Sequence, residues 1–178
     1  GAFVYENRAI DWLEADIVAF KSGLDATKLL VHEGEARLQG QGKLALENWK
    51  PDQTGRVSGA FELRNLSLEK VAAGAGYKTP VNGVAAGTLQ LAGTLLEPEL
   101  TANLTVTKVS AFGQPVDQLR VRGRYASRSL SVESLEADIK GARVRASGVF
   151  THREGDWRNG ALRLEASGKG LRLSDLGP

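Results

Sequence analysis

The feature that most constrains the fold is a long alternation of apolar and polar residues between positions 119 and 150. The chain reads Leu-Arg-Val-Arg-Gly-Arg-Tyr at 119–125 and Ala-Arg-Val-Arg-Ala-Ser-Gly-Val-Phe at 142–150. A period of two residues is typical of a β-strand with one apolar and one polar face. We therefore predict four successive strands in one amphipathic sheet, at 119–125, 130–132, 135–139 and 142–150.

The same alternation continues along the rest of the chain and predicts an all-β fold. At 10–20 a strand is favoured and a helix is the alternative, because Trp12, Leu13 and Ile17 also suit a helical face. Residues 1–9 are ambiguous. Further strands are expected at 24–31, 36–46, 57–63, 87–93, 100–106 and 162–166.

One short segment breaks the period of two and predicts a helix near residues 67–74. Ser67 suits its N-cap and Gly74 suits its end. Loops are expected at 48–55 and 151–160, and the internal prolines are expected to fall in breaks between strands.

Composition excludes several classes of chemistry. The 178 residues contain no Cys, which excludes disulfides, thiolate metal sites and a cysteine nucleophile. The net charge of +2 arises from 23 basic and 21 acidic residues, so no electrostatic footprint for nucleic acid is present. No apolar run approaches the roughly 18 residues of a membrane helix. Because Met is also absent, we expect residues 1–178 to be a single segment of a longer protein.

An internal repeat is predicted between the first and last thirds of the chain. Ala-Arg-Leu at 36–38 and Ala-Arg-Val at 142–144 lie 106 positions apart, and Gly42 and Gly148 share this offset. After a small slip, Trp49 would match Trp157. The predicted repeat spans 24–71 and 130–176, a unit of several strands and a short helix.

The two faces of the predicted sheet have different consequences. Opposite charges on neighbouring strands are expected to pair across the polar face. One strand carries Arg120, Arg122 and Arg124, the next carries Glu136 and Asp138, and the third carries Arg143 and Arg145. The apolar face must be covered. It could pack into a filled sandwich core, which composition slightly favours, or it could form a trough that holds an apolar guest.

We find no constellation of catalytic or metal-binding residues in the sequence. His32 near a strand end and His152 in a predicted loop have no ligand-spaced neighbours, so both are expected to be surface residues. No nucleophile, phosphate-loop or zinc motif is present. Paired acids such as Glu14 and Asp16 fall on the polar face. A β-solenoid glycan lyase is the best enzyme alternative, but its short regular coils are absent, and we predict a protein that is not an enzyme and needs no cofactor or metal.

Three segments together resemble the TamB/AsmA-like family of bacterial envelope proteins. One is GTLQLAGTLLEPELTANLTV at 87–106, because a Gly-x-Leu-x-Leu-x-Gly strand followed by x-x-Pro-x-Leu-x-small-x-Leu recurs in that family. Another is FGQPVDQL at 112–119, which leads into the strands that contain Ala-Ser-Gly at 146–148. The third is Leu-Ser-Leu at 66–68 with the short helix and VAAGTLQL at 84–91, similar to the family's helix that re-enters the sheet.

The resemblance implies a long, mostly antiparallel sheet curled into a taco-like groove, an incomplete sandwich or solenoid. It further implies a periplasmic bridge that shields acyl chains and conducts phospholipids between inner and outer membranes. The parent would be anchored in the inner membrane and could have an outer-membrane β-barrel partner; nucleic acid would not be a partner. The residues implied to line the groove are Leu38, Leu44, Leu46, Val57, Phe61, Leu63, Leu89, Leu91, Leu104, Val106, Leu119, Val121, Tyr125, Leu130, Val132, Ile139, Val144, Phe150, Leu162 and Leu164.

Two other functions remain open from the sequence. Such a chain could be a scaffold or chaperone surface for the assembly of outer-membrane proteins, working through exposed edge strands. It could also be a carbohydrate-binding β-domain, for which Trp49 and Trp157 on an open face would be the signal.

Overall fold

A computed structural model of the 178-residue chain describes residues 3–5, 8–74, 81–111, 114–139, 142–153 and 156–170. The predicted all-β, antiparallel class with one short helix is confirmed. The elements are β1 (Phe3–Tyr5), β2 (Arg8–Ile10), β3 (Trp12–Phe20), β4 (Gly23–Glu33), β5 (Ala36–Glu47), β6 (Lys50–Pro51), β7 (Val57–Ser67), α1 (Leu68–Gly74), β8 (Val81–Gly93), β9 (Pro98–Ala111), β10 (Gln114–Ala126), β11 (Ser129–Ile139), β12 (Ala142–Arg153) and β13 (Asp156–Lys169).

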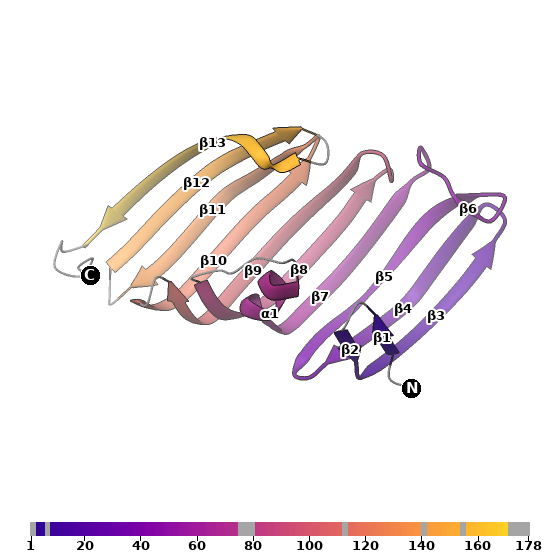
Figure 1. Ribbon diagram of the computed structural model, residues 1–178, viewed down its shortest axis with the longest axis horizontal. Coiled ribbons are helices and arrows are strands. Elements are labelled where there is room, and N and C mark those ends of the chain that lie inside the picture. Colours follow the sequence, from indigo (N-terminus) through magenta and orange to yellow (C-terminus); the bar gives the residue numbers. More distant parts are fainter. Residues whose placement is uncertain are drawn as a thin grey trace. The chain divides into compact units, whose positions relative to one another are not determined.

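Eleven of these strands belong to one sheet, and Figure 1 allows their succession to be followed. The hydrogen-bonded order is β13-β12-β11-β10-β9-β8-β7-β5-β4-β3, with β6 paired only to β5. β1 and β2 form a separate two-stranded pair. Apart from the insertion of β6 between β5 and β7 and of α1 between β7 and β8, neighbours in the sheet are neighbours in sequence, as in a chain of antiparallel hairpins.

The chain divides into two compact units, which we describe separately. The first unit comprises residues 1–66, 86–102 and 125–127, and therefore holds β1 to β7 with parts of β8 and β9. The second unit comprises residues 67–85, 103–124 and 128–178, and holds α1, the first residues of β8, most of β9 and β10, and all of β11, β12 and β13.

The register of β4 with β5 in the first unit returns in β11 with β12 of the second unit. Leu24 is opposite Leu44 and Ala26 opposite Gly42 in the first hairpin. In the second, every one of the corresponding pairs is found 106 positions later, from Ser129 opposite Thr151 to Ile139 opposite Ala142. The two hairpins thus share strand bounds and register, although the full predicted repeat of 24–71 with 130–176 stays a prediction.

Both hairpins also contain a β-bulge at the same place. The register shifts between Ala26 and Leu29 in β4 and between Val132 and Leu135 in β11. A bulge inserts an extra residue, so the apolar residues change parity while staying on one face. The prediction of separate strands at 130–132 and 135–139 was therefore wrong, because the interrupted alternation marks a bulge inside a single strand.

Several predicted boundaries also need correction. The predicted loop at 151–160 is mostly strand, since β12 continues to Arg153 and β13 begins at Asp156. The prediction that prolines fall in breaks was wrong for three of them. Pro98 is the first residue of β9, and Pro51 and Pro115 are the second residues of β6 and β10. A missing backbone N–H is tolerated at such strand ends. Pro80 lies outside the described residues.

Two other local predictions are confirmed. Residues 12–20 form a strand rather than a helix. The helix α1 begins after Ser67, whose Oγ accepts a hydrogen bond from the backbone N–H of Lys70 at 3.3 Å, as an N-cap does.

The described residues do not build a filled sandwich core. Eight apolar residues are buried, among them Val57, Leu63 and Val106, yet no large side chain in the described part of the chain is fully buried. A core of the usual packing density would enclose many such side chains. The slight preference for a filled core that composition suggested is therefore not met within either unit.

Candidate functional site

An apolar face runs across β3, β4, β5 and β7 of the first unit, and we call it the first apolar face. Residues directly opposite each other in a ladder point to the same side of the sheet. The strand pairings join Ile17 to Ala26, Ala26 to Gly42 and Gly42 to Gly59. The face consists of Leu13, Ala15, Ile17, Ala19, Leu24, Ala26, Leu29, Val31, Leu38, Gly40, Gly42, Leu44, Val57, Gly59, Phe61 and Leu63.

A corresponding face in the second unit, the second apolar face, spans β11, β12 and β13. Phe150 of β12 is opposite both Leu130 of β11 and Leu162 of β13. The face consists of Leu130, Val132, Leu135, Ala137, Ile139, Ala142, Val144, Ala146, Gly148, Phe150, Leu162, Leu164, Ala166 and Gly168. The inward set that the alternation predicted on 142–150 is therefore placed on one side of the sheet.

The residues implied to line a groove mostly fall on these faces. Twelve of the twenty do so by pairing, and Leu46 continues the parity of β5. In β10, Leu119, Val121 and Tyr125 alternate with arginines of the polar face, as Leu104 and Val106 alternate with Asn103 in β9. Continuing the ladder from the bridge between Arg56 and Thr94 without a bulge puts Leu89 opposite Phe61 and Leu91 opposite Gly59, on the first apolar face.

Sequence reasoning missed part of the first apolar face. Leu13, Ile17, Leu24, Leu29 and Val31 were not among the implied lining residues, yet the pairing places them beside those that were. The signal was a change of parity at residues 27 and 28, where Leu24 and Ala26 give way to Leu29 and Val31. A bulge explains this change, whereas an uninterrupted period of two does not.

Aromatic rings on both apolar faces lie over glycines. A Cβ built on Gly59 would meet Phe61 Cε2 at 2.5 Å, and one built on Gly160 would meet Phe150 Cε2 at the same distance. The rings occupy the space that a side chain at each glycine would need. An aromatic side chain that packs over a glycine restores apolar contact at a weak point of a sheet.

Apolar side chains are most exposed on the strands at the two ends of the strand order. On β3, Ile17 is 52% exposed, and on β13, Leu162 and Leu164 are 69% and 64% exposed. Val57 and Leu63 of the interior strand β7 are only 9% exposed. Large apolar patches that stay exposed mark surfaces that meet another apolar molecule.

The polar face of the second unit carries part of the predicted ladder of opposite charges, which ion pairs confirm for Arg120, Arg143 and Arg145. Glu136 accepts a hydrogen bond from Arg145 Nε at 3.1 Å, and Arg120 lies 3.7 Å from its other oxygen. Asp138 accepts one from Arg143 Nε at 3.0 Å and thereby raises the pKa of that guanidinium above its usual value. Arg122 donates to Asn103. These charges are paired in water, as on a solvated face.

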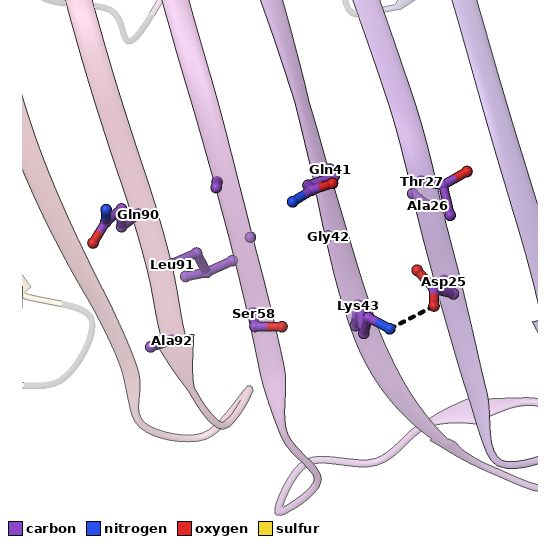
Figure 2. A pocket seen from close by; sticks show the side chains of 12 residues that line it. Asp25, Ala26, Thr27, Gln41, Gly42, Lys43, Ser58, Gln90, Leu91 and Ala92 are labelled. Carbon is purple, nitrogen blue, oxygen red and sulfur yellow. Dashed lines mark hydrogen bonds and ion pairs between the residues drawn. The ribbon is translucent and has the colours of Figure 1, made fainter.

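The polar face of the first unit contains a shallow hollow of about 440 Å³ over β4, β5, β7 and β8. Figure 2 shows its polar side chains, including the ion pair between Lys43 Nζ and Asp25 at 2.6 Å. Gln41, Gln90 and Ser58 add amide and hydroxyl groups. No aromatic ring lines this hollow, so it lacks the flat stacking surface typical of sugar sites.

The histidines are not both surface residues. His152 lies in β12 rather than in a loop, is only 9% exposed, and stacks on Phe150 with ring centroids 5.9 Å apart. Its parity puts it on the second apolar face, opposite Gly160. His32 is half-buried in β4 and packs against Trp12 at 5.0 Å. Among the described residues no group of three or more His, Cys, Asp or Glu could hold a metal ion.

No described helix is long and apolar enough to span a membrane. Searches against protein-family models, curated proteins and solved structures give no match to this chain.

Proposed function

We propose that this chain is a segment of a periplasmic bridge that shields acyl chains on its apolar faces and conducts phospholipids between the inner and outer membranes. The observation that carries the proposal is the pair of apolar faces, one in each unit, whose large side chains are never fully buried in the described part of the chain. A surface of this kind has free energy to gain from an apolar guest.

The magnitudes support a guest with acyl chains. Exposing acyl chain to water costs roughly 0.8 kcal/mol per CH₂, so a chain of about 16 carbons costs about 12 kcal/mol. A run of apolar side chains removes most of this barrier. Tight binding is unnecessary, because a bilayer and an apolar face offer the lipid a similar environment.

The division between the two sides of the sheet fits the same function. In both units the side opposite the apolar face carries ion pairs, such as Lys28 with Glu14 and Arg145 with Glu136. That side stays in water while the other meets the acyl chains. We also propose membership of the TamB/AsmA-like family, a parent anchored in the inner membrane, and a role that is not enzymatic; these rest on the resemblance described above.

The experiment is lipid capture by the purified segment, measured by native mass spectrometry and lipid extraction. We expect bound phospholipid or detergent on the wild-type protein, and at least fivefold less on Val144→Asp and Leu104→Asp, whose carboxylates would enter the apolar side. Leu164→Asp tests the same side at a residue so exposed that folding does not depend on it. Thr105→Asp is the matched control on the polar side.

Two outcomes would end the proposal. One is a wild-type protein that captures neither lipid nor detergent. The other is equal capture by Leu164→Asp, Thr105→Asp and wild type when circular dichroism shows all three folded.

A scaffold for the assembly of outer-membrane proteins is the second candidate, favoured by the exposed end strands β3 and β13. Crosslinking to an unfolded outer-membrane strand without lipid capture would support it. The carbohydrate-binding alternative is weaker, because Trp49 lies exposed in a turn at φ 70° and not on a strand face, and the polar hollow has no aromatic lining.

A further inference from the structure

β13 of the second unit corresponds to β7 of the first. Gly42 and Gly148 occupy the same place in the two matching hairpins; Gly42 is opposite Gly59 of β7, and Gly148 is opposite Leu164 of β13. A Cβ on Gly42 would meet the carbonyl oxygen of Ser58 at 3.0 Å, and one on Gly148 would meet that of Arg163 at 2.8 Å. Gly59 therefore corresponds to Leu164 and Ser58 to Arg163, both at an offset of 105 positions.

The two strands differ at their second edge. β7 pairs with β5 on one side and with β8 on the other. Its β8 side is fixed by an antiparallel bridge from Arg56 to Thr94. β13 pairs with β12, and no other strand in the described part of the chain uses its second edge. An edge of this kind is a template for another strand.

Corresponding side chains of β7 and β13 differ in exposure. Val57 of β7 is 9% exposed, whereas its counterpart Leu162 of β13 is 69% exposed. Both project from the apolar side and both have an apolar residue opposite them on the preceding hairpin, Leu44 and Phe150. The two strands also differ in their neighbours, because β7 has β8 beside it and β13 has no second neighbour among the described strands.

We infer that the free edge of β13 accepts an antiparallel strand with the pattern of β8, Gly-x-Leu-x-Leu-x-Gly. This interaction is independent of lipid transport. Continuing the ladder from the Arg56–Thr94 bridge without a bulge puts Leu89 opposite Phe61, and both residues line one hollow in the first unit. Ala166 of β13 corresponds to Phe61 of β7, so the strand that pairs with β13 would place its equivalent of Leu89 opposite Ala166.

The chemistry of the two surfaces agrees with this pairing. On the apolar side, the partner's equivalent of Leu91 would lie opposite Leu164, and its equivalent of Gly93 would lie opposite Leu162. On the polar side, the positions between the leucines in β8 are Thr88, Gln90 and Ala92, which carry no charge. They would lie beside Arg163 and Glu165 without a like-charge contact, which a strand rich in one charge would create.

The test is disulfide trapping with a synthetic peptide of residues 81–93, because the protein has no cysteine of its own. Ala166→Cys protein is mixed with peptides that carry cysteine at position 89 or at position 90. Adjacent positions on a strand point to opposite sides, so only one of the two can meet the thiol on β13. We expect the peptide with cysteine 89 to be trapped at least tenfold faster, and the preference to reverse with Glu165→Cys protein.

Other results would overturn the inference. Equal trapping of both peptides, or no trapping above a scrambled peptide, would show that β13 does not recognise this strand in this register. A disulfide-linked dimer of Ala166→Cys protein that forms faster than the peptide adduct would show that the edge is taken by a second copy of the chain. Lipid capture by the same samples is measured separately, so its failure does not bear on this result.

Discussion

The hairpins β4–β5 and β11–β12 share the same strand pairing and differ mainly in the chemistry of their polar faces. Their pairs and their bulge coincide at an offset of 106 positions. On the apolar side, most corresponding residues stay apolar, such as Leu44 and Phe150, and the exceptions lie at the ends of the strands, where Glu33 corresponds to Ile139 and Leu46 to His152. On the polar side they diverge: Leu30 opposite Gln39 in the first becomes Glu136 opposite Arg145 in the second. The comparison teaches that the register and the middle of the apolar face are constrained together, while the polar face varies more.

The glycines show where the backbone itself imposes this constraint. Gly42 and Gly148 correspond, and at each a Cβ would press against a backbone carbonyl of the next strand. Gly40 differs, because its counterpart Ala146 carries a Cβ. The reason is across the ladder, where Gly40 is opposite Phe61 and Ala146 is opposite Ala166.

The largest expected effect comes from making the first hairpin resemble the second at this position. Gly40→Ala would put a methyl group against Phe61 Cδ1, at 2.5 Å, and against the carbonyl oxygen of Ala60. We expect the free energy of unfolding to fall by about 2–3 kcal/mol, the cost of overpacking. Urea denaturation, with hydrogen exchange on β5 and β7 as a local probe, measures it.

The double variant sharpens the same prediction. Gly40→Ala with Phe61→Ala reproduces the Ala146–Ala166 pair of the second unit. It should be destabilised by less than the sum of the single changes, with a coupling of about 1 kcal/mol or more. If the two changes in the free energy of unfolding simply added, the absence of a side chain at Gly40 would not be coupled to the ring of Phe61.

Next in size is the glycine that both hairpins keep. Gly148→Ala should lower the free energy of unfolding by about 1–2 kcal/mol, and Gly42→Ala by somewhat less, because the contact with the carbonyl oxygen is 2.8 Å in the first case and 3.0 Å in the second. Gly23→Ala is the control, since its Cβ would meet Leu44 O at an ordinary 3.4 Å and its counterpart is Ser129. Equal losses in all three variants would show that carbonyl approach is not the cause.

The two hairpins also show how much of the fold the sequence alone could predict. Alternation was enough to predict the strands, the inward set of 142–150 and the charge ladder, because each depends on neighbours two positions apart. The bulges at 27–28 and 133–134 were missed, since they appear only as a change of parity that a break between strands would also produce. The burial of His152 was missed as well, because it depends on β12 continuing beyond Phe150.

The apolar surface was only partly predictable for the same reason. The implied lining residues included none from β3 or β4, although the pairing places Leu13, Ile17, Leu24, Leu29 and Val31 on the first apolar face. Whether the apolar side was covered could not follow from period or composition, since both are the same for a filled core and an open face. That distinction needed the pairing partners and the exposure of residues such as Leu162.

A smaller effect is expected from moving the charge pair between hairpins. Leu30→Glu with Gln39→Arg transfers the Glu136–Arg145 pair to the first unit at identical register. Because the pair is exposed, we expect a coupling free energy of roughly 0.2–1 kcal/mol that disappears near 1 M salt. A double-mutant cycle in urea measures it, and a coupling that salt leaves unchanged would contradict the electrostatic explanation.

The smallest effect concerns pH and a carboxylate that only the first unit has. Glu62 accepts hydrogen bonds from Arg64 Nε and Gln39 Nε2, each at 2.7 Å, and chiefly the Arg64 contact lowers the pKa of Glu62 below its ordinary 4.5. A group whose pKa is lowered on folding stabilises the folded state above its unfolded pKa, and this stabilisation is lost as pH falls through the folded pKa. The counterpart in β13 is Ser167, which does not titrate there.

Glu62→Gln should therefore flatten the loss of stability of the first unit below pH 4.5 and leave β12 and β13 unchanged. Hydrogen exchange measured between pH 2 and 6 on β7 and β13 separately checks this, because the two strands occupy the same place in matching registers. An equal change on both strands would mean that the acid response belongs to the chain as a whole. A change confined to β7 would instead show that a side chain of the variable face can be altered while the shared backbone register stays in place.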